Sequence, residues 1–171
     1  SVVPAHRKRL KSLLRTFERV EKMDPLATQG NQPDRTLQAV QAFYDAHPYP
    51  PPVEDLDGYR RRWQDAGRRR ADFHLHWPEQ PYRADLRVLV AGCGTSQAAK
   101  HALREPGSHV AGIDLSAESV RQTEALKRRY ELTNLEVHQL PIEQVGALGQ
   151  RFDKIVCTGV LHHLPDPDAG L

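Results

Sequence analysis

The sequence has little cysteine and no long apolar run, and both absences narrow what it can be. It holds only two cysteines, Cys93 and Cys157, among 171 residues. Small domains built on disulfides need several pairs, so we interpret both thiols as free. No apolar run approaches the roughly 20 residues of a membrane span, and the first residues lack the apolar core of a signal peptide. These absences predict a soluble, cytoplasmic protein without a membrane partner.

The overall charge of the chain is close to neutral, which is compatible with an ordinary globular protein. The net charge is +2 and the isoelectric point is about 8.6, which makes a weak electrostatic case for binding nucleic acid or membranes. No internal repeat is present, and the only low-complexity tract is Pro50–Pro52. The length suits one sizeable core that carries an N-terminal extension.

The N-terminal region, residues 1–84, is expected to be a helical extension rich in proline and arginine. Within residues 6–23, apolar side chains recur every three or four positions and basic ones occupy the opposite face, which predicts an amphipathic helix. This helix either packs its apolar stripe on the rest of the protein or binds a partner. A second helix is expected to begin near Asp34 and to end before Pro48.

The rest of the extension is irregular and strongly basic. Pro48 and Pro50–Pro52 predict extended backbone, as an ordered arm or a linker. Arginines then flank Trp63 at 60–62 and 68–70, a pattern that fits either binding of single-stranded nucleic acid or a short exposed helix whose arginine stems cover apolar surface. On a strand, His74 and His76 would share one face, but no further ligands accompany them, so we predict no metal site.

From residue 85 onward the pattern alternates between short apolar runs and amphipathic helices. The predicted strands cover residues 86–91, 109–114, 135–140 and 152–158, and helices follow the first two. Strands that alternate with helices form a parallel sheet with right-handed crossovers. We therefore predict an α/β protein, in which residues 85–171 are the N-terminal half of a doubly wound, Rossmann-like domain.

The sequence Gly92-Cys93-Gly94 lies between the first strand and its helix, at the end of the sheet where ligands of such folds bind. Asp114 ends the second strand, twenty residues beyond Gly94, where a carboxylate can accept hydrogen bonds from both hydroxyls of a ribose. This order of features predicts a nucleoside cofactor. Gln97 stands where a dinucleotide site has its third glycine, and no Gly-Lys-Ser/Thr follows the turn, which argues against NAD and against a P-loop.

Three segments, VLVAGCGTS, GIDLS and FDKIVCTGVLHHLPDP, resemble motifs of the class I S-adenosylmethionine-dependent methyltransferases. The AGCGT form and the FYDAHPYPPP arm are similar to a bacterial subgroup of that family. The resemblance implies S-adenosylmethionine as cofactor and methyl transfer to a small molecule or a protein. The loop after the fourth strand lacks the Asn/Asp-Pro-Pro-aromatic element of enzymes that methylate nucleobase amines, so a nucleic-acid acceptor is not expected.

By the same resemblance, residues at the ends of all four strands would border the cofactor. Those near its methionine part and sulfonium would be Ala91, Gly92, Cys93, Gly94, Thr158, Gly159 and Val160. Asp114 would hold the ribose, and the adenine would lie among Leu115, Leu140, Pro141 and Ile142.

Departures from the family pattern accompany these matches. Val90 and Pro141 replace two acidic residues, and Ser96 replaces a glycine. Loss of the first carboxylate removes a group that orients the cofactor's amino end. His162 or His163 could act as a base toward a hydroxyl or carbon acid, or the pair could be a structural part of its loop.

The sheet of this family has seven strands in the order 3-2-1-4-5-7-6, whereas four are found here, and a fourth strand with an open apolar edge is a liability. We expect the chain to be the N-terminal piece of a longer enzyme, or to complete its sheet with a partner or a second copy. The alternative function is a non-catalytic nucleoside-binding or protein-interaction module that uses the helix at 6–23 and the arginines at 60–70.

Overall fold

The computed structural model describes residues 32–48, 50–158 and 160, and of residues 32–37 it describes the backbone. The described residues from Pro33 onward belong to one compact unit. The predicted helix at 6–23 lies outside the described residues. Among the described residues, no helix is both long enough and apolar enough to cross a membrane.

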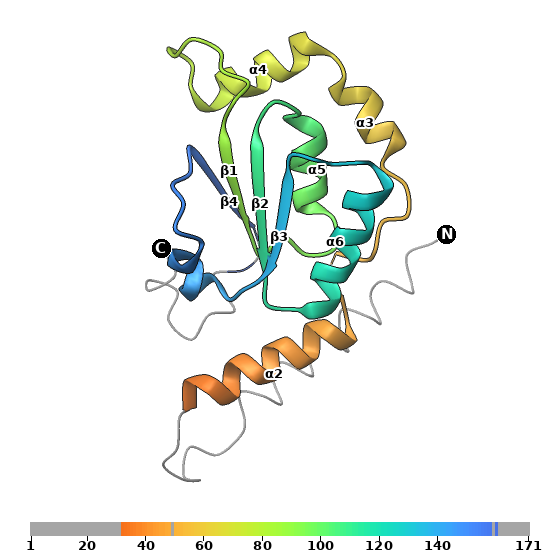
Figure 1. The fold of residues 1–171 in the computed structure, drawn as a ribbon, viewed down its shortest axis with the longest axis vertical. Coiled ribbons are helices and arrows are strands. Elements are labelled where there is room, and N and C mark those ends of the chain that lie inside the picture. The colour runs from red at the N-terminus through yellow and green to blue at the C-terminus, as the bar shows by residue number, and fades with distance from the viewer. Residues whose placement is uncertain (1–31, 49, 159, 161–171) are drawn as a thin grey trace, which may run out of the picture. The chain divides into compact units, whose positions relative to one another are not determined.

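The centre of the fold is a parallel sheet of four strands in the order β3-β2-β1-β4 (Figure 1). The strands are β1 (Arg87–Ala91), β2 (His109–Asp114), β3 (Leu135–Gln139) and β4 (Lys154–Cys157). The register pairs Ala91 with Ile113 and with Cys157, so the strand ends meet at one edge. This order is the expected doubly wound arrangement, and all four predicted strands are confirmed.

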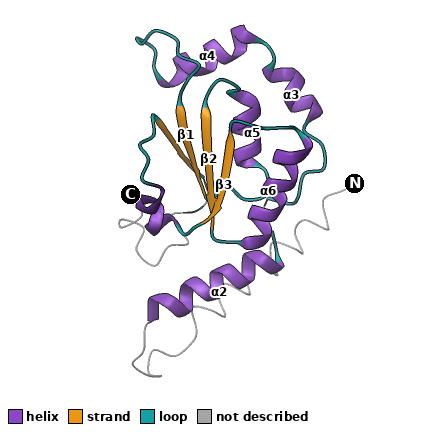
Figure 2. Ribbon diagram, viewed as in Figure 1, coloured by secondary structure: helices purple, strands orange, loops and turns teal. Residues whose placement is uncertain are grey.

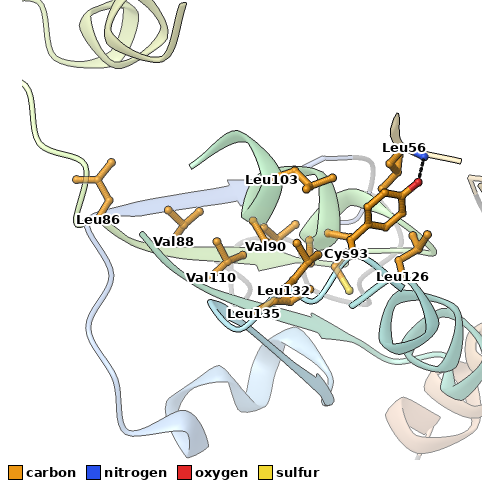
Figure 3. Close-up of a cluster of buried hydrophobic side chains, with 14 of the residues drawn as sticks. Leu56, Leu86, Val88, Val90, Cys93, Leu103, Val110, Leu126, Leu132 and Leu135 are labelled. Carbon is orange, nitrogen blue, oxygen red and sulfur yellow. Dashed lines mark hydrogen bonds between the residues drawn. The ribbon is translucent and has the colours of Figure 1, made fainter. Parts of the chain in front are cut away.

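Two helices, α5 (Gln97–Arg104) and α6 (Ala117–Arg129), lie against one face of the sheet (Figure 2). The core between these layers is built from branched aliphatic side chains of the strands and small residues of α5, such as Ala98 and Ala102. Short alanine side chains allow a helix to approach the sheet closely. Figure 3 shows Val88, Val90 and Val110 pointing into this cluster from β1 and β2.

The N-terminal segments also contribute to this core. The helices are α2 (Gln32–Ala46), α3 (Asp57–Trp63) and α4 (Ala66–His76). Leu56 is buried, and its backbone N–H donates to the hydroxyl of Tyr130 at the end of α6 (Figure 3). Trp63 and Phe73 are buried as well. The predicted boundary between residues 84 and 85 stays a prediction, but α3 does pack on α5.

The other face of the sheet has a smaller cluster. Leu89, Ala111 and Ile113 are buried there, and half-buried apolar residues of the 3₁₀-helix η1 (Ile142–Leu148) pack against them. β4 pairs only with β1 among the described strands, and the side chain of Ile155 on it is 65% exposed. The expected open edge at β4 is therefore present in the described part of the chain.

Two N-terminal expectations can be compared with the fold. Helix α2 ends at Ala46, before Pro48, as predicted from the restriction that proline places on its predecessor. His74 and His76 lie on helix α4 and not on a strand, so the argument that they share a strand face was wrong. Helix α4 forms because Asp65 caps it: its carboxylate accepts from the backbone N–H groups of Gly67 and Arg68.

Candidate functional site

The turn between β1 and α5 has a left-handed backbone at two positions. Gly92 has φ of +66° and Gly94 has φ of +54°, a conformation that side chains with a Cβ rarely adopt. Two hydrogen bonds from neighbouring elements hold the turn. The N–H of Cys93 donates to the carbonyl of Ile113 at 2.9 Å, and the hydroxyl of Thr123 on α6 donates to the carbonyl of Gly94 at 2.9 Å. A loop fixed in this way presents its backbone at the carboxyl edge of the sheet.

Asp114 stands beside this turn at the end of β2. Its Oδ2 accepts the backbone N–H of Gly94 at 2.8 Å, and its Oδ1 accepts that of Ser116 at 2.9 Å. An ionised carboxylate offers about four lone-pair positions, so each oxygen keeps capacity for a further donor. The carboxylate therefore joins the two loops at which the strands β1 and β2 end.

Burial raises the pKa of Asp114 above its ordinary value, the largest effect at this side chain. The hydrogen bonds from Ser116 and Gly94 act in the opposite direction, and the nearby charge of Asp45 adds to the increase. Burial also raises the pKa of the Cys93 thiol, so this cysteine is a poor nucleophile. Cys93 and Cys157 are not joined in a disulfide, as the sequence predicted.

The end of α2 and the residues after it are tied to the same two loops, and we call residues 43–48 and 50–52 the N-terminal arm. Asp45 Oδ1 accepts the hydroxyl of Ser116 at 2.6 Å and the backbone N–H of Glu118 at 3.3 Å. The hydroxyl of Thr95, fully buried, donates to the carbonyl of Pro50 at 2.8 Å. The arm thus contacts the turn after β1 and the first turn of α6.

The ends of β3 and β4 complete this edge. The backbone N–H of Leu140 donates to the carbonyl of Asp114 at 2.9 Å, and the side chain of Gln139 donates to the carbonyl of Leu115. Leu140 and Ile142 are half-buried against the smaller apolar cluster. Val160 lies over Gly92, because a Cβ built on that glycine would come within 2.0 Å of a Val160 methyl group.

The structure therefore brings most of the predicted cofactor-binding residues to one edge of the sheet. Ala91 and Cys93 are buried, Gly94 and Asp114 are in contact, Pro141 precedes η1, and Thr158 is exposed after β4. Gly159, His162 and His163 lie outside the described residues. The roles assigned to all of these residues remain predictions.

Sequence reasoning gave no role to three residues that hold this site together. Asp45 is part of the FYDAHPYPPP arm, yet its reach to Ser116 spans 71 positions of the chain. Thr95 and Thr123 are fully buried polar residues of the turn and of α6. Of the three, only Thr95 had a signal in the sequence, because it directly follows Gly94.

Comparison with known proteins adds an independent line of information. The profile of a family described as "Methyltransferase domain" matches residues 83–171. An uncharacterized protein of Synechococcus sp. is 36% identical over 152 residues, which are 81% of this chain and 34% of that protein. A ubiquinone biosynthesis O-methyltransferase of Leptothrix cholodnii is 31% identical over 96 residues, 54% of this chain and 40% of that enzyme.

Among solved structures, the N-terminal domain of EvdMO1 with SAH bound is similar, with 28% identity and a TM-score of 0.50. That match covers 63% of this chain and 43% of the EvdMO1 chain. The chain spans about a third of the length of the Synechococcus relative, at 34%.

Proposed function

This chain belongs to the methyltransferase domain family, and we propose that it binds S-adenosylmethionine beside Gly94 and Asp114 and serves methyl transfer to a small-molecule or protein acceptor. The observation that carries the proposal is the Asp114 carboxylate, which is buried, joined to the glycine turn and still able to accept further donors. The EvdMO1 domain, whose structure has SAH bound, has the same fold.

The described residues fit the nucleoside half of this cofactor. Asp114 would accept the ribose hydroxyls, because a carboxylate takes two donors in a bidentate arrangement. Leu115, Leu140 and Ile142 are half-buried apolar neighbours of that position and would flank the adenine. Desolvation by these side chains strengthens each hydrogen bond to the carboxylate.

The methionine half requires a local movement. Val160 packs directly on Gly92, so the backbone of this glycine is covered on the side where a Cβ would project. We expect Val160 and the segment after β4 to shift when the cofactor binds. Gly92 and Gly94 then leave room for a ligand against the backbone, since neither carries a Cβ.

Bound S-adenosylmethionine supplies a sulfonium methyl group, which an acceptor attacks in line. The task of the protein in such a displacement is to align donor and acceptor and to exclude water. The N-terminal arm is placed to help, because Asp45 and Thr95 attach it to both loops of the site. His162 or His163 would serve as a base for an acceptor that must lose a proton.

The test is calorimetric titration of the chain with S-adenosylhomocysteine (SAH), with NAD as the control ligand. We expect saturable binding of SAH alone. Asp114→Ala should weaken it by about 1.5–3 kcal/mol, or roughly tenfold to a hundredfold in Kd, through loss of charge-assisted hydrogen bonds. Asp85→Ala is the matched control, since this carboxylate is exposed and pairs with Arg83.

Failure of a folded wild-type chain to bind SAH would overturn the cofactor assignment. The alternative, a non-catalytic interaction module acting through the arginines at 60–70, would then be favoured for this chain. Binding of SAH that Asp114→Ala leaves unchanged would retain a nucleoside site but move it away from β2.

A further inference from the structure

A second site is suggested by a cavity of about 320 Å³ at the opposite, amino-terminal edge of the sheet. Helix α4 forms one wall, and the loop before β1 forms another. The remaining wall comes from the end of α5 and from Lys154, the first residue of β4. Strands β1, β2 and β4 begin at this edge and end at the edge that holds Asp114, so the cavity is distinct from the candidate cofactor site.

Positive charge predominates around the cavity. Five cationic side chains line it against two acidic ones, and the list is Arg69, Arg70, Arg83, Arg104 and Lys154 against Asp72 and Glu105. Both acids already have partners. Glu105 lies 2.9 Å from Lys154, and Asp72 lies 3.7 Å from Arg104.

Arg69 and Arg70 are the two cations that remain uncompensated. Within residues 32–48, 50–158 and 160, neither has a carboxylate partner: Arg69 donates to the carbonyl of Trp63, and Arg70 stands 5.3 Å from the ring centre of Tyr82. Guanidinium groups form paired hydrogen bonds with phosphate and carboxylate groups. Two adjacent ones at the wall of a cavity are suited to an anion.

Polar atoms at the wall also lack partners. Arg104 Nε and Glu105 Oε2 are buried without a hydrogen-bond partner among the described residues. A buried polar atom left in this state destabilises the fold, so each is normally satisfied by protein, water or ligand. The wall of the cavity therefore contains polar groups that the described residues leave unsatisfied.

Another part of the cavity wall is apolar and consists of aromatic side chains. Phe73 lies with its ring centre 4.9 Å from that of Trp77 and 5.4 Å from that of Tyr82. Trp77 and Tyr82 are half-buried, so they present ring surface to the cavity that they line. Flat apolar walls with a few convergent polar groups are typical of sites for small organic ligands.

We propose that this cavity binds a small aromatic anion, with its phosphate or carboxylate held by Arg69 and Arg70 and its ring against the aromatic wall. The cavity volume is large enough for one aromatic ring with one anionic group and too small for a folded protein partner. The site uses part of the arginine-rich segment at 60–70 but gives it a small-molecule ligand in place of nucleic acid. It does not depend on the proposed methyl transfer.

The test is titration calorimetry of the chain with phenyl phosphate and, separately, with benzoate. We expect saturable binding of at least one of them, and the preferred one identifies the anionic group. Inorganic phosphate and the neutral benzyl alcohol should each bind at least tenfold more weakly, because each supplies only half of the contacts. Arg70→Gln should raise the Kd at least fivefold.

Arg60→Gln is the matched control, because Arg60 is an exposed arginine of α3 that does not line the cavity. Fluorescence gives a second readout, since the chain has two tryptophans and Trp77→Phe should abolish the response to ligand. Equal affinities for phenyl phosphate and inorganic phosphate would overturn the proposal, as would an unchanged Kd in Arg70→Gln. Asp114→Ala should leave phenyl phosphate binding intact, which separates this site from the cofactor site.

Discussion

Ser116 donates its hydroxyl hydrogen to Asp45 Oδ1 at 2.6 Å, which links the end of α2 to the N-terminus of α6. The same serine caps α6 by accepting from the backbone N–H of Ser119, and its own N–H donates to Asp114. Two carboxylates are therefore attached to one residue. Their mutual repulsion is one reason why the pKa of Asp114 is raised.

The first prediction concerns the pH dependence of SAH binding. Protonation of Asp114 removes the charge that would hold the ribose, so affinity should fall as pH decreases through the raised pKa of this carboxyl. Asp45→Asn removes a negative charge but keeps an oxygen that can accept from Ser116. The midpoint of the pH profile should therefore move to lower pH in this variant, as calorimetry at a series of pH values would measure.

Asp153→Asn provides the control, because that carboxylate lies at the other edge of the sheet, where it accepts the N–H of Arg87. It should not move the midpoint. A profile that is the same in Asp45→Asn and in wild type would show that the two carboxylates do not interact.

Much of the sheet and the glycine turn could be predicted from sequence, because both depend on local patterns. Runs such as Arg87–Ala91 combine β-branched residues with a following helix, and the turn needs positive φ at Gly92 and Gly94, which glycine supplies. The attachment of Asp45 to Ser116 could not be predicted, because it joins positions 71 apart and depends on how α2 docks.

The cavity at the other edge of the sheet could not be predicted from the sequence either. Its arginines were visible as charge around Trp63, but which of them line a cavity depends on how α3 packs on α4 and α5 and on the Asp72–Arg104 ion pair that joins α4 to α5. His74 and His76 illustrate the same limit, since a three-residue pattern gave no means of distinguishing a strand from the helix that Asp65 caps. Local patterns identified the elements, and long-range contacts determined the sites.

The second prediction concerns how Thr95 holds the N-terminal arm. Thr95→Val keeps the shape of this buried side chain but removes its hydrogen bond to the carbonyl of Pro50. We expect a loss of about 0.5–1.5 kcal/mol in the free energy of unfolding and faster hydrogen exchange at Val53. The amide of Leu56 should stay protected, because Tyr130 accepts it.

Thr133→Val is the matched control for this experiment, since Thr133 is exposed. It should leave exchange at Val53 unchanged. Unaltered exchange at Val53 in Thr95→Val would mean that other contacts hold the arm.

The third prediction concerns the ion pair of Lys154 and Glu105, whose side chains are 8% and 13% exposed. Although burial pushes the pKa of Glu105 up, the hydrogen-bonded ammonium of Lys154 and the nearby His101 hold it below its ordinary value. A lowered folded-state pKa contributes stability above the unfolded pKa, and this stability is lost as pH falls through the folded pKa. Acid should therefore weaken this contribution.

Lys154→Met leaves the Glu105 carboxylate buried without its cation, which should cost about 3–5 kcal/mol in urea unfolding at neutral pH. The deficit relative to wild type should shrink as pH falls, because protonation of Glu105 removes the unpaired buried charge. The double variant Lys154→Met/Glu105→Leu should regain most of the loss, because no buried charge remains. A double variant as unstable as the single one would contradict this account.

The last prediction separates two reasons for glycine at position 92. Gly149 has a similar φ of +60°, but a Cβ there would meet nothing within 4 Å. Gly149→Ala should therefore cost only the left-handed conformation, roughly 1–2 kcal/mol. Gly92→Ala adds a clash with Val160, so its free energy of unfolding in urea should fall further, by about another 1–3 kcal/mol. Adding Val160→Ala to the Gly92→Ala variant should restore the steric part of the lost stability alone. It removes the methyl group in contact and leaves the backbone strain at position 92. Equal losses in Gly92→Ala and Gly149→Ala would contradict this account, because they would show that Val160 adds no steric cost at position 92.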